Sequence, residues 1–232
     1  RVNVVVLHMK IFVVCVMQME VMKMEDDLFA DMVAAGEQAA YVLSRPPGHH
    51  AFADLAGGFC FLNNSGIAAE RLLKAGKRPA ILDIDVHHGN GTQGIFYERG
   101  DVLTVSLHAD PVRFYPFFWG GADERGSGDG EGANLNIPLS IGSDGKRFIE
   151  ALDRLLESMA AFRPEALVVA LGLDAHRDDP LAGLALDTDD FAPIGARLKA
   201  LDLPTVLVQE GGYPTPSLGN NLAAFLRGFG IA

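Results

Sequence analysis

The chain has 232 residues, of which 49% are hydrophobic and 21% are charged. This length and composition are typical of one packed globular domain, or at most two. The formal net charge of −11 argues against nucleic acid as a partner, because contacts with phosphate groups need basic patches. Cys15 and Cys60 are the only cysteines and form no CxxC motif, so we expect a reducing, cytoplasmic compartment.

Residues 1–27 form an atypical leader segment that is rich in Val and Met. Its longest apolar run, Ile11 to Met17, is far shorter than the roughly 20 residues that a membrane-spanning helix needs. The segment also lacks the layout of a signal peptide. We therefore expect one or two short strands there and no membrane association. Because the chain begins with Arg1 rather than Met, we also expect it to be a fragment.

From residue 28 to residue 232, patterns typical of helices and strands alternate within one expected domain. The first helix is predicted over Asp31–Ala40, and Asn64 and Gly76 are expected to cap and end a second one. Further helices are expected in KRFIEALDRLLESMAAF, FAPIGARLKAL and PSLGNNLAAFLRGF. Strands are expected in AAYVLSRPPG, PAILDID, VLTVSLH, EALVVALG and PTVLVQEGG. A long glycine-rich loop is expected from about His108 to Asn134.

The expected strands are short, almost continuously apolar and separated by helices. This pattern predicts a three-layer α/β/α fold with a mostly parallel sheet. In such folds, ligands bind beyond the carboxyl ends of the strands. Polar clusters follow the expected strand ends in PPGHH, DIDVHHGNG, SLHADP, LGLDAHRDDP and VQEGGY. We therefore expect a functional site at that edge of the sheet.

The motif DIDVHH indicates a metal site. Asp83, Asp85 and His87 share one face of an extended strand, since alternate side chains point the same way. Two neighbouring carboxylates repel each other unless a cation lies between them, and an imidazole with carboxylates suits zinc or another first-row divalent ion. Asp174, at the end of another apolar strand, is the best candidate for a third ligand. A solvated turn with incidental charges fits poorly, because the preceding residues are apolar.

The other polar motifs do not decide a function when each is taken alone. His49 and His50 in RPPGHH could be ligands, acid–base groups or surface residues. Asp178 and Asp179 are expected to cap a loop. Tyr213 follows two glycines, which would let its phenol reach a neighbouring site and stabilise an oxyanion, although an isolated tyrosine more often packs in the core.

Taken together, the motifs resemble the histone deacetylase family. The resemblance is carried, in this order and spacing, by RPPGHH, GGFCFLNN, DIDVHHGNGTQ, SLH, LGLDAHRDDPLAG and EGGY. GNGTQGIFYERGDV and DPVRFYPFF favour the bacterial acetylpolyamine amidohydrolases and histone deacetylase-like amidohydrolases within it. The resemblance covers residue 40 to the C-terminus. It implies a hydrolase that removes acetyl groups from acetylpolyamines or acetyl-lysine peptides by attack of metal-activated water.

The resemblance also implies a role for each matching residue. It implies a catalytic Zn²⁺, or Fe²⁺ in its place, held by Asp85, His87 and Asp174. His50 would be the general base, and His49 would support the charge. Tyr213 would bind the carbonyl oxygen of the substrate.

Further positions match the surroundings of the family's metal site. Asp83 would accept a hydrogen bond from His49, and Asn90 would face His50. A structural K⁺ or Na⁺ is expected at Asp83, Ser106 and Leu107, with the carbonyl groups of Asp85 and His87. The aliphatic stem of the substrate would lie in a channel formed by Phe59, Tyr115 and Gly58. His88 points to the other face of the strand, where we expect a structural hydrogen bond.

The chain departs from the family pattern before the tandem histidines, where only about 48 residues precede His49. Part of the usual N-terminal region and of the channel rim is therefore expected to be missing, which leaves homodimer formation open. Two other functions also stay open. Asp174 to Asp178 offer the D-x-H-x-D pattern of a binuclear manganese ureohydrolase. A truncated, metal-loaded domain could also bind acetylated or cationic ligands without turnover.

Overall fold

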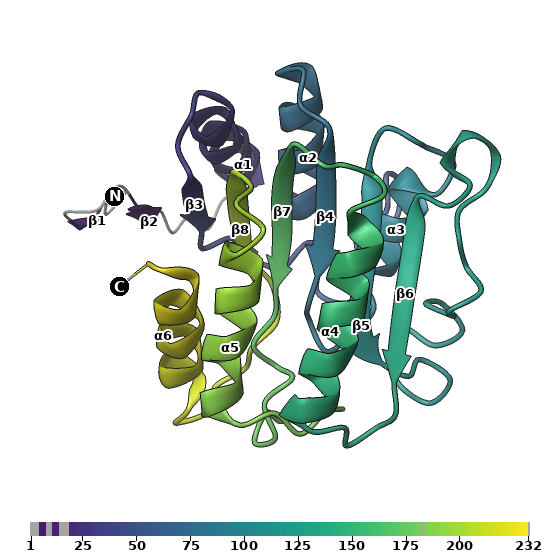
Figure 1. Ribbon diagram of the computed structural model, residues 1–232, viewed down its shortest axis with the longest axis vertical. Helices are drawn as coiled ribbons and strands as arrows, with labels where there is room; N and C mark the ends of the chain where they lie inside the picture. Colours follow the sequence, from purple (N-terminus) through teal and green to yellow (C-terminus); the bar gives the residue numbers. More distant parts are fainter. Residues whose placement is uncertain (1–4, 8–10, 14–18, 182, 232) are drawn as a thin grey trace.

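The computed structural model describes residues 5–7, 11–13, 19–181 and 183–231 (Figure 1). Cys15 and most of the predicted apolar run Ile11 to Met17 lie outside these residues. The helices are α1 (Met19–Ala34), α2 (Asn64–Lys74), α3 (Asn90–Phe96), α4 (Gly145–Met159), α5 (Thr188–Lys199) and α6 (Leu218–Phe229), with a short 3₁₀ helix at Gly128–Gly130. The strands are β1 (Val5–Leu7), β2 (Ile11–Val13), β3 (Ala39–Val42), β4 (Pro79–Asp83), β5 (Leu103–Ala109), β6 (Asn134–Leu139), β7 (Ala166–Leu171) and β8 (Thr205–Gln209).

Six strands form one parallel sheet in the order β3-β8-β7-β4-β5-β6 (Figure 1). Strand β4 pairs with β5 on one side and with β7 on the other, so that Asp83 lies level with both Ser106 and Ala170. The strand order reverses between β4 and β7, and such a switch point is where open α/β sheets bind their ligands. The short β1 and β2 form a separate antiparallel pair.

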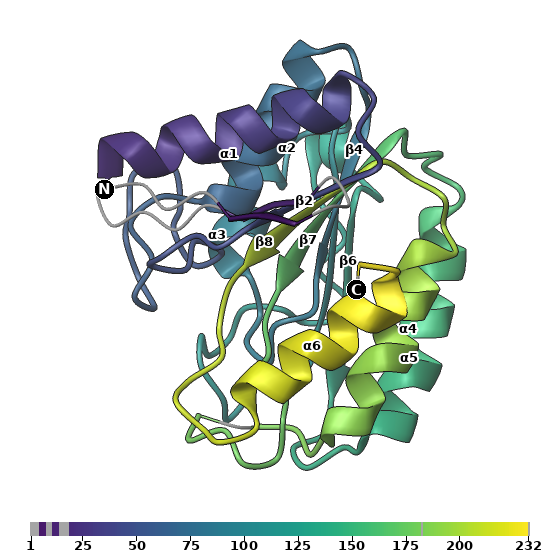
Figure 2. The ribbon, with the colours of Figure 1, turned by 90° about the vertical axis from the view of Figure 1, so that its left-hand side faces the viewer.

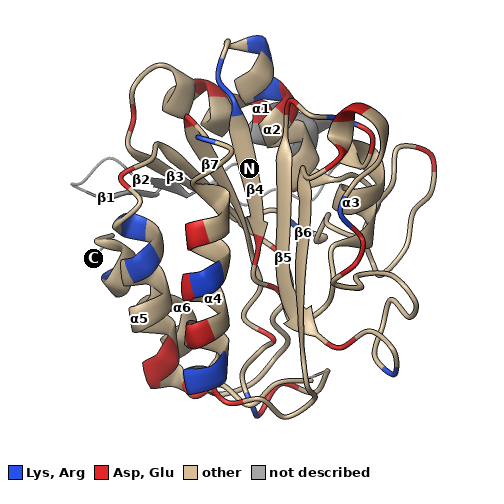
Figure 3. Ribbon diagram, turned by 45° about the vertical axis from the view of Figure 1, so that its right-hand side comes forward, with Lys and Arg blue, Asp and Glu red and all other residues tan. Residues whose placement is uncertain are grey.

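Helices cover both faces of the sheet, which confirms the predicted three-layer fold. Figure 2 shows α1 and α2 on one face and α4, α5 and α6 on the other. A buried cluster that includes Phe29 and Leu72 fills one interface, and one that includes Phe148, Phe191 and Phe225 fills the other. Charged residues line the outer sides of α4 and α5 (Figure 3). None of the described helices is both long and apolar enough to cross a membrane.

The first predicted helix was wrong at both ends. Helix α1 begins at Met19 and ends at Ala34, and Ala39–Val42 form an edge strand instead. The helix ends because Gly36 adopts a φ of +114°, a conformation that favours glycine. Helix α1 crosses the predicted boundary between residues 27 and 28, and the division into a leader and a catalytic domain stays a prediction.

The sequence also missed or misplaced three local features. Asn63, rather than Asn64, caps α2, because its Oδ1 accepts a hydrogen bond of 2.7 Å from the backbone N–H of Gly66. Helix α3 and strand β6 were not predicted. Strand β6 contains Pro138, which an edge strand tolerates because it needs no hydrogen bonds on one side.

Candidate active site

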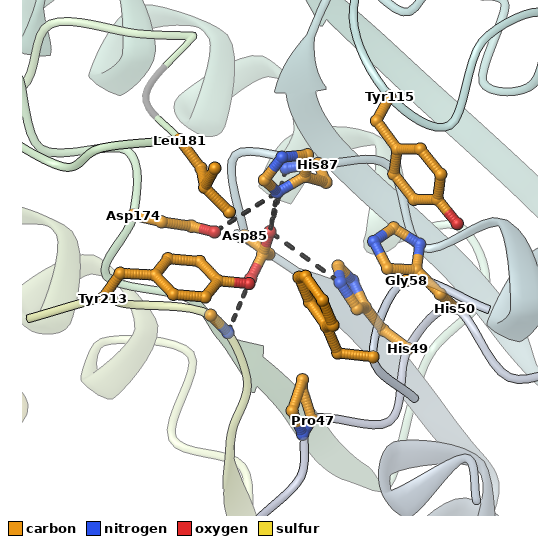
Figure 4. Close-up of a pocket in the computed structure, with 12 residues that line it drawn as sticks. Pro47, His49, His50, Gly58, Asp85, His87, Tyr115, Asp174, Leu181 and Tyr213 are labelled. Carbon is orange, nitrogen blue, oxygen red and sulfur yellow. Dashed lines mark hydrogen bonds and ion pairs between the residues drawn. The ribbon is translucent and has the colours of Figure 1, made fainter. Parts of the chain in front are cut away.

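The predicted site residues meet at the carboxyl edge of the sheet, beside the switch point between β4 and β7 (Figure 4). Because all six strands run parallel, residues far apart in the sequence arrive at the same edge. The side chains that line one cavity there, following β3, β4, β7 and β8, are His49, His50, Asp85, His87, Asp174 and Tyr213.

Asp85, His87 and Asp174 form a compact buried cluster whose candidate ligand atoms all lie within 4.8 Å of one another. His87 Nδ1 lies 3.1 Å from Asp85 Oδ1 and 3.3 Å from Asp174 Oδ2. The two aspartates are fully buried, and His87 is 8% exposed. This cluster contains the three residues that the sequence selected as metal ligands.

The cluster fits a divalent metal ion. Asp174 Oδ2 is buried and makes no hydrogen bond, although His87 lies nearby. The lone pairs of this oxygen are therefore available to a cation. Burial raises the pKa of Asp174, and the charge of Asp85 raises it further. A cation between the carboxylates would remove this repulsion. One nitrogen and two oxygen donors leave a tetrahedral metal one open position, as in catalytic zinc sites.

Two glycines allow the backbone to lie directly against the carboxylates. A Cβ atom on Gly211 would lie 2.2 Å from Asp174 Oδ2, and one on Gly172 would lie 2.4 Å from Asp85 Cα. Gly211 also donates its backbone N–H to Asp85 Oδ2 over 2.8 Å. The carboxylates are therefore oriented by main-chain atoms that no larger residue could supply at these positions.

His49 pairs with a buried carboxylate, as the sequence predicted. Its Nδ1 lies 2.9 Å from Asp83 Oδ2, and both side chains are buried. Burial alone would lower the pKa of His49, but the charges of Asp83 and Asp85 outweigh it and hold this pKa well above the ordinary value. His49 is therefore suited to carry a positive charge.

His50 has the opposite electrostatic character. Its Nδ1 lies 2.7 Å from Asn90 Oδ1, and a carbonyl oxygen only accepts, so Nδ1 carries the hydrogen and Nε2 keeps a free lone pair. Burial, followed by the neighbouring positive charge of His49, lowers the pKa of His50 to about 2. The two rings lie 4.0 Å apart between centroids. The pair thus combines one charged and one neutral imidazole.

Glu210 is a site residue that the sequence analysis missed. Its Oε2 accepts the backbone N–H groups of Gly48 and His49 over 2.6 and 3.1 Å, and its Oε1 accepts the hydroxyl of Ser65 over 3.1 Å. Burial raises its pKa to about 7. Glu210 orients the loop that carries the tandem histidines. Its place in VQEGGY, directly after a buried strand, was the available signal.

The cluster lies in a cavity of about 260 Å³ whose outer walls are mainly apolar. Gly58, Phe59 and Tyr115, the three predicted channel residues, all line it, and Figure 4 shows the Tyr213 hydroxyl pointing toward Asp85. Pro47 and Leu181 also line the cavity and were not predicted. Such walls suit an extended aliphatic group.

Two features beside the cavity differ from the sequence interpretation. The space that Gly58 leaves is filled by His50, because a Cβ on Gly58 would lie 2.1 Å from the Cδ2 atom of that ring. Phe114 stacks on His87 with ring centroids 4.8 Å apart and was missed, because nothing in the sequence of a long loop indicates which aromatic side chain turns inward.

A polar layer beneath the site is formed by His88, Gln93, Asn134 and Asn136. Gln93 Oε1 accepts hydrogen bonds from His88 Nε2 at 3.0 Å, from Asn134 Nδ2 at 3.0 Å and from Asn136 Nδ2 at 2.8 Å. All four side chains are buried. The structural hydrogen bond expected of His88 is therefore confirmed, and the layer ties the loop after β4 to β6.

The predicted monovalent cation site stays a prediction, but the orientation of Ser106 supports it. Burial lowers the pKa of His108 to about 4, so this ring is neutral. His108 Nε2 lies 3.0 Å from the carbonyl oxygen of Gly120, and its Nδ1 lies 2.8 Å from Ser106 Oγ. The carbonyl oxygen of Gly120 only accepts, so Nε2 carries the hydrogen of the neutral ring. Nδ1 is then the acceptor, and the hydroxyl of Ser106 donates to it. The lone pairs of Ser106 therefore remain available beside Asp83 and Leu107.

The D-x-H-x-D pattern does not form a second metal site. His176 stacks near Phe191, with centroids 6.5 Å apart, and its Nδ1 accepts the backbone N–H of Asp178. The Asp178 side chain is exposed. Within the described residues, the cluster of Asp85, His87 and Asp174 is the one group of three or more such side chains placed to hold a metal.

A doubly covered parallel sheet with a buried carboxylate–imidazole cluster and a histidine pair at its switch point defines an α/β protein with a candidate metal centre. Residues 27–229 match the histone deacetylase domain model. The chain therefore belongs to the histone deacetylase family, as its motifs predicted.

The chain is also similar to individual family members. It is 52% identical, over 87% of its length, to an acetylpolyamine amidohydrolase of Burkholderia pseudomallei (strain 1710b), and 49% identical, over 86%, to one of Mycoplana ramosa. These matches cover 59% of each relative. The crystal structure of an acetylpolyamine aminohydrolase from Burkholderia pseudomallei superposes with a TM-score of 0.87 at 51% identity. The superposition covers 90% of this chain and 61% of the Burkholderia pseudomallei chain.

Proposed function

We propose that this chain is a metal-dependent amidohydrolase that removes acetyl groups from small acetylated amines. One observation carries the proposal: a buried cluster of three metal-type ligands, a charged–neutral histidine pair and a tyrosine line the same cavity. Relatives at about 50% identity are named acetylpolyamine amidohydrolases, which supports acetylpolyamines as the substrate class.

Asp85, His87 and Asp174 would hold the metal ion. Zn²⁺ suits one imidazole and two carboxylates, and Fe²⁺ is the alternative that the same donors accept. When bound, the metal supplies polarisation of the acetyl carbonyl and acidifies water at its open position. Gly211 keeps Asp85 oriented through its backbone N–H, so the ligand geometry is fixed before substrate enters.

The two tandem histidines have different roles. His50, neutral and with a free Nε2 lone pair, takes the proton from the attacking water and returns it to the leaving amine. Asn90 holds its ring through Nδ1. His49, kept charged by Asp83, stabilises negative charge that develops nearby. General acid–base catalysis of this kind contributes roughly 10²–10⁴-fold.

Tyr213 acts as a hydrogen-bond donor to the carbonyl oxygen as negative charge develops on it. Burial raises the pKa of Tyr213 well above its usual range, and the charges of Asp85 and Asp174 raise it further. The phenol therefore stays protonated at neutral pH, as a donor must. The walls formed by Phe59, Tyr115 and Leu181 would hold the aliphatic stem and keep water away.

Acetate release by the purified, zinc-supplemented chain tests the proposal. The substrate panel is acetylputrescine, acetylspermine and an acetyl-lysine peptide, with metal content measured on the same samples. We expect turnover of the acetylpolyamines, a loss of roughly 10²–10³-fold for Tyr213→Phe, and a loss of roughly 10²–10⁴-fold for His50→Ala.

The panel also separates the competing functions. Two tightly bound Mn²⁺ per chain would favour a ureohydrolase. Saturable binding of an acetylated amine without acetate release would favour a ligand-binding domain. A rate that neither Tyr213→Phe nor His50→Ala changes would overturn the assignment of these side chains.

A further inference from the structure

The side chain of Asp179 contacts backbone N–H groups of the proposed active site rather than its side chains. Asp179 is only 7% exposed. Oδ2 accepts the backbone N–H of Tyr213 over 2.8 Å, and Oδ1 accepts the backbone N–H of Leu181 over 2.9 Å. Tyr213 and Leu181 both line the cavity. One carboxylate therefore joins two separate segments of the cavity wall.

The turn that carries Tyr213 needs such a contact. Gly212 adopts a φ of +131°, and two consecutive glycines give the backbone more freedom than any other pair of residues. Two carboxylates, from the segments that follow β4 and β7, restrict this turn. Asp85 accepts the N–H of Gly211, and Asp179 accepts the N–H of Tyr213. The carbonyl oxygen of Gly211 also accepts the backbone N–H of Leu173 over 2.9 Å. Without Asp179, the hydrogen bonds that hold this turn among the described residues would end at Gly211, before the bend at Gly212.

We infer that Asp179 is a positioning residue that fixes the Tyr213 hydroxyl over the metal cluster by holding the backbone of the Gly-Gly-Tyr turn. This role rests on the proposed function of Tyr213. It goes beyond loop capping, because the contact with Tyr213 spans 34 residues of sequence. A misplacement of about 1 Å in a reacting group costs on the order of a hundredfold in rate.

A carboxylate suits this role because each of its two oxygens accepts one N–H group. Asn offers a single acceptor oxygen, so Asp179→Asn must lose one of the two contacts and turn an NH₂ group toward a backbone N–H. Asp178 provides the matched control, since it is the adjacent residue, has the same chemistry and carries an exposed side chain.

The first measurement is backbone amide exchange in the wild-type, Asp179→Asn and Asp178→Asn proteins. We expect slow exchange at Tyr213 and Leu181 in the wild type and in Asp178→Asn, and at least tenfold faster exchange at one of these amides in Asp179→Asn. Unprotected amides at Tyr213 in the wild-type protein would overturn the inference even if the variant failed to fold.

The second measurement separates positioning from a general structural effect. We expect Asp179→Asn to lower kcat about ten- to a hundredfold with KM and metal content within about twofold, and Asp178→Asn to leave kcat unchanged. In a Tyr213→Phe background, the further loss from Asp179→Asn should fall below about threefold, because the hydroxyl it positions is absent.

The outcomes distinguish the inference from the function on which it rests. An unchanged kcat in Asp179→Asn, or an equal loss with and without the Tyr213 hydroxyl, would overturn the positioning role. A wild-type chain that releases no acetate would overturn the proposed function instead. The exchange data would then decide by themselves whether Asp179 holds the turn.

Discussion

Replacing Asp174 by Asn should affect the metal-free and the metal-loaded protein in different ways. In the metal-free protein, Asp174 Oδ2 is buried without a hydrogen bond and lies in the field of Asp85. Asn can keep the Oδ1 contact with the backbone N–H of Val86, which is 3.0 Å long, and it carries no charge. We therefore expect the metal-free variant to be at least as stable as the metal-free wild type.

The metal-loaded wild type should gain stability that the variant cannot. At a free metal concentration of about 100 times Kd, binding stabilises the folded state by about 2.7 kcal/mol. For a chain of this size, 1 kcal/mol corresponds to about 2–4 °C in Tm, so zinc should raise the wild-type Tm by about 5–11 °C. The variant lacks one of three protein ligands, and its Tm should rise by less than about 2 °C at the same zinc concentration.

The assay is thermal unfolding at neutral pH after dialysis against a chelator, with and without added zinc, together with elemental analysis. Asp178→Asn serves as the control and should behave like the wild type. An equal zinc-induced rise in Tm for Asp174→Asn and the wild type would refute the metal assignment. A metal-free variant less stable than the metal-free wild type would refute the electrostatic part of the reasoning.

Three further changes test the surroundings of the site. Asn90→Asp places a negative charge beside Nδ1 of His50 and so raises the pKa of this ring. Because His50 must be unprotonated to act as the base, the acidic limb of the kcat/KM–pH profile should move to higher pH. Gln93→Met removes the shared acceptor of three buried donors and should lower the free energy of unfolding by about 3 kcal/mol, measured in urea. Phe59→Ala removes an apolar channel wall and should raise KM for acetylputrescine about tenfold, with kcat changed less.

The metal cluster was predictable from the sequence because parallel strands end at a common edge. Asp85 and Asp174 each follow an apolar run, so a strand prediction that is correct to within two residues already brings them together. The alternation of side chains along a strand then selected His87 rather than His88, and the structure agrees, since His88 turns into the polar layer.

Residues whose role depends on tertiary contacts were not predictable. Glu210 and Asp179 act on backbone N–H groups of segments 161 and 34 residues away, and no local pattern records such a partner. Strand β6 was missed because Asn134 and Asn136 are polar, yet they face the buried polar layer rather than solvent. The helix prediction at Asp31–Ala40 failed because Gly36 interrupts otherwise good helix formers.

The two glycines that lie against the carboxylates also limit which substitutions the site can accept. Gly211 and Gly172 leave no room for even a methyl group on the metal side, so a variant library gains little from sampling these positions. Phe59 and Leu181 are 67% and 39% exposed and contact the cavity from its outer side. Substrate range can therefore be altered at the mouth of the cavity while the metal-binding side is left untouched.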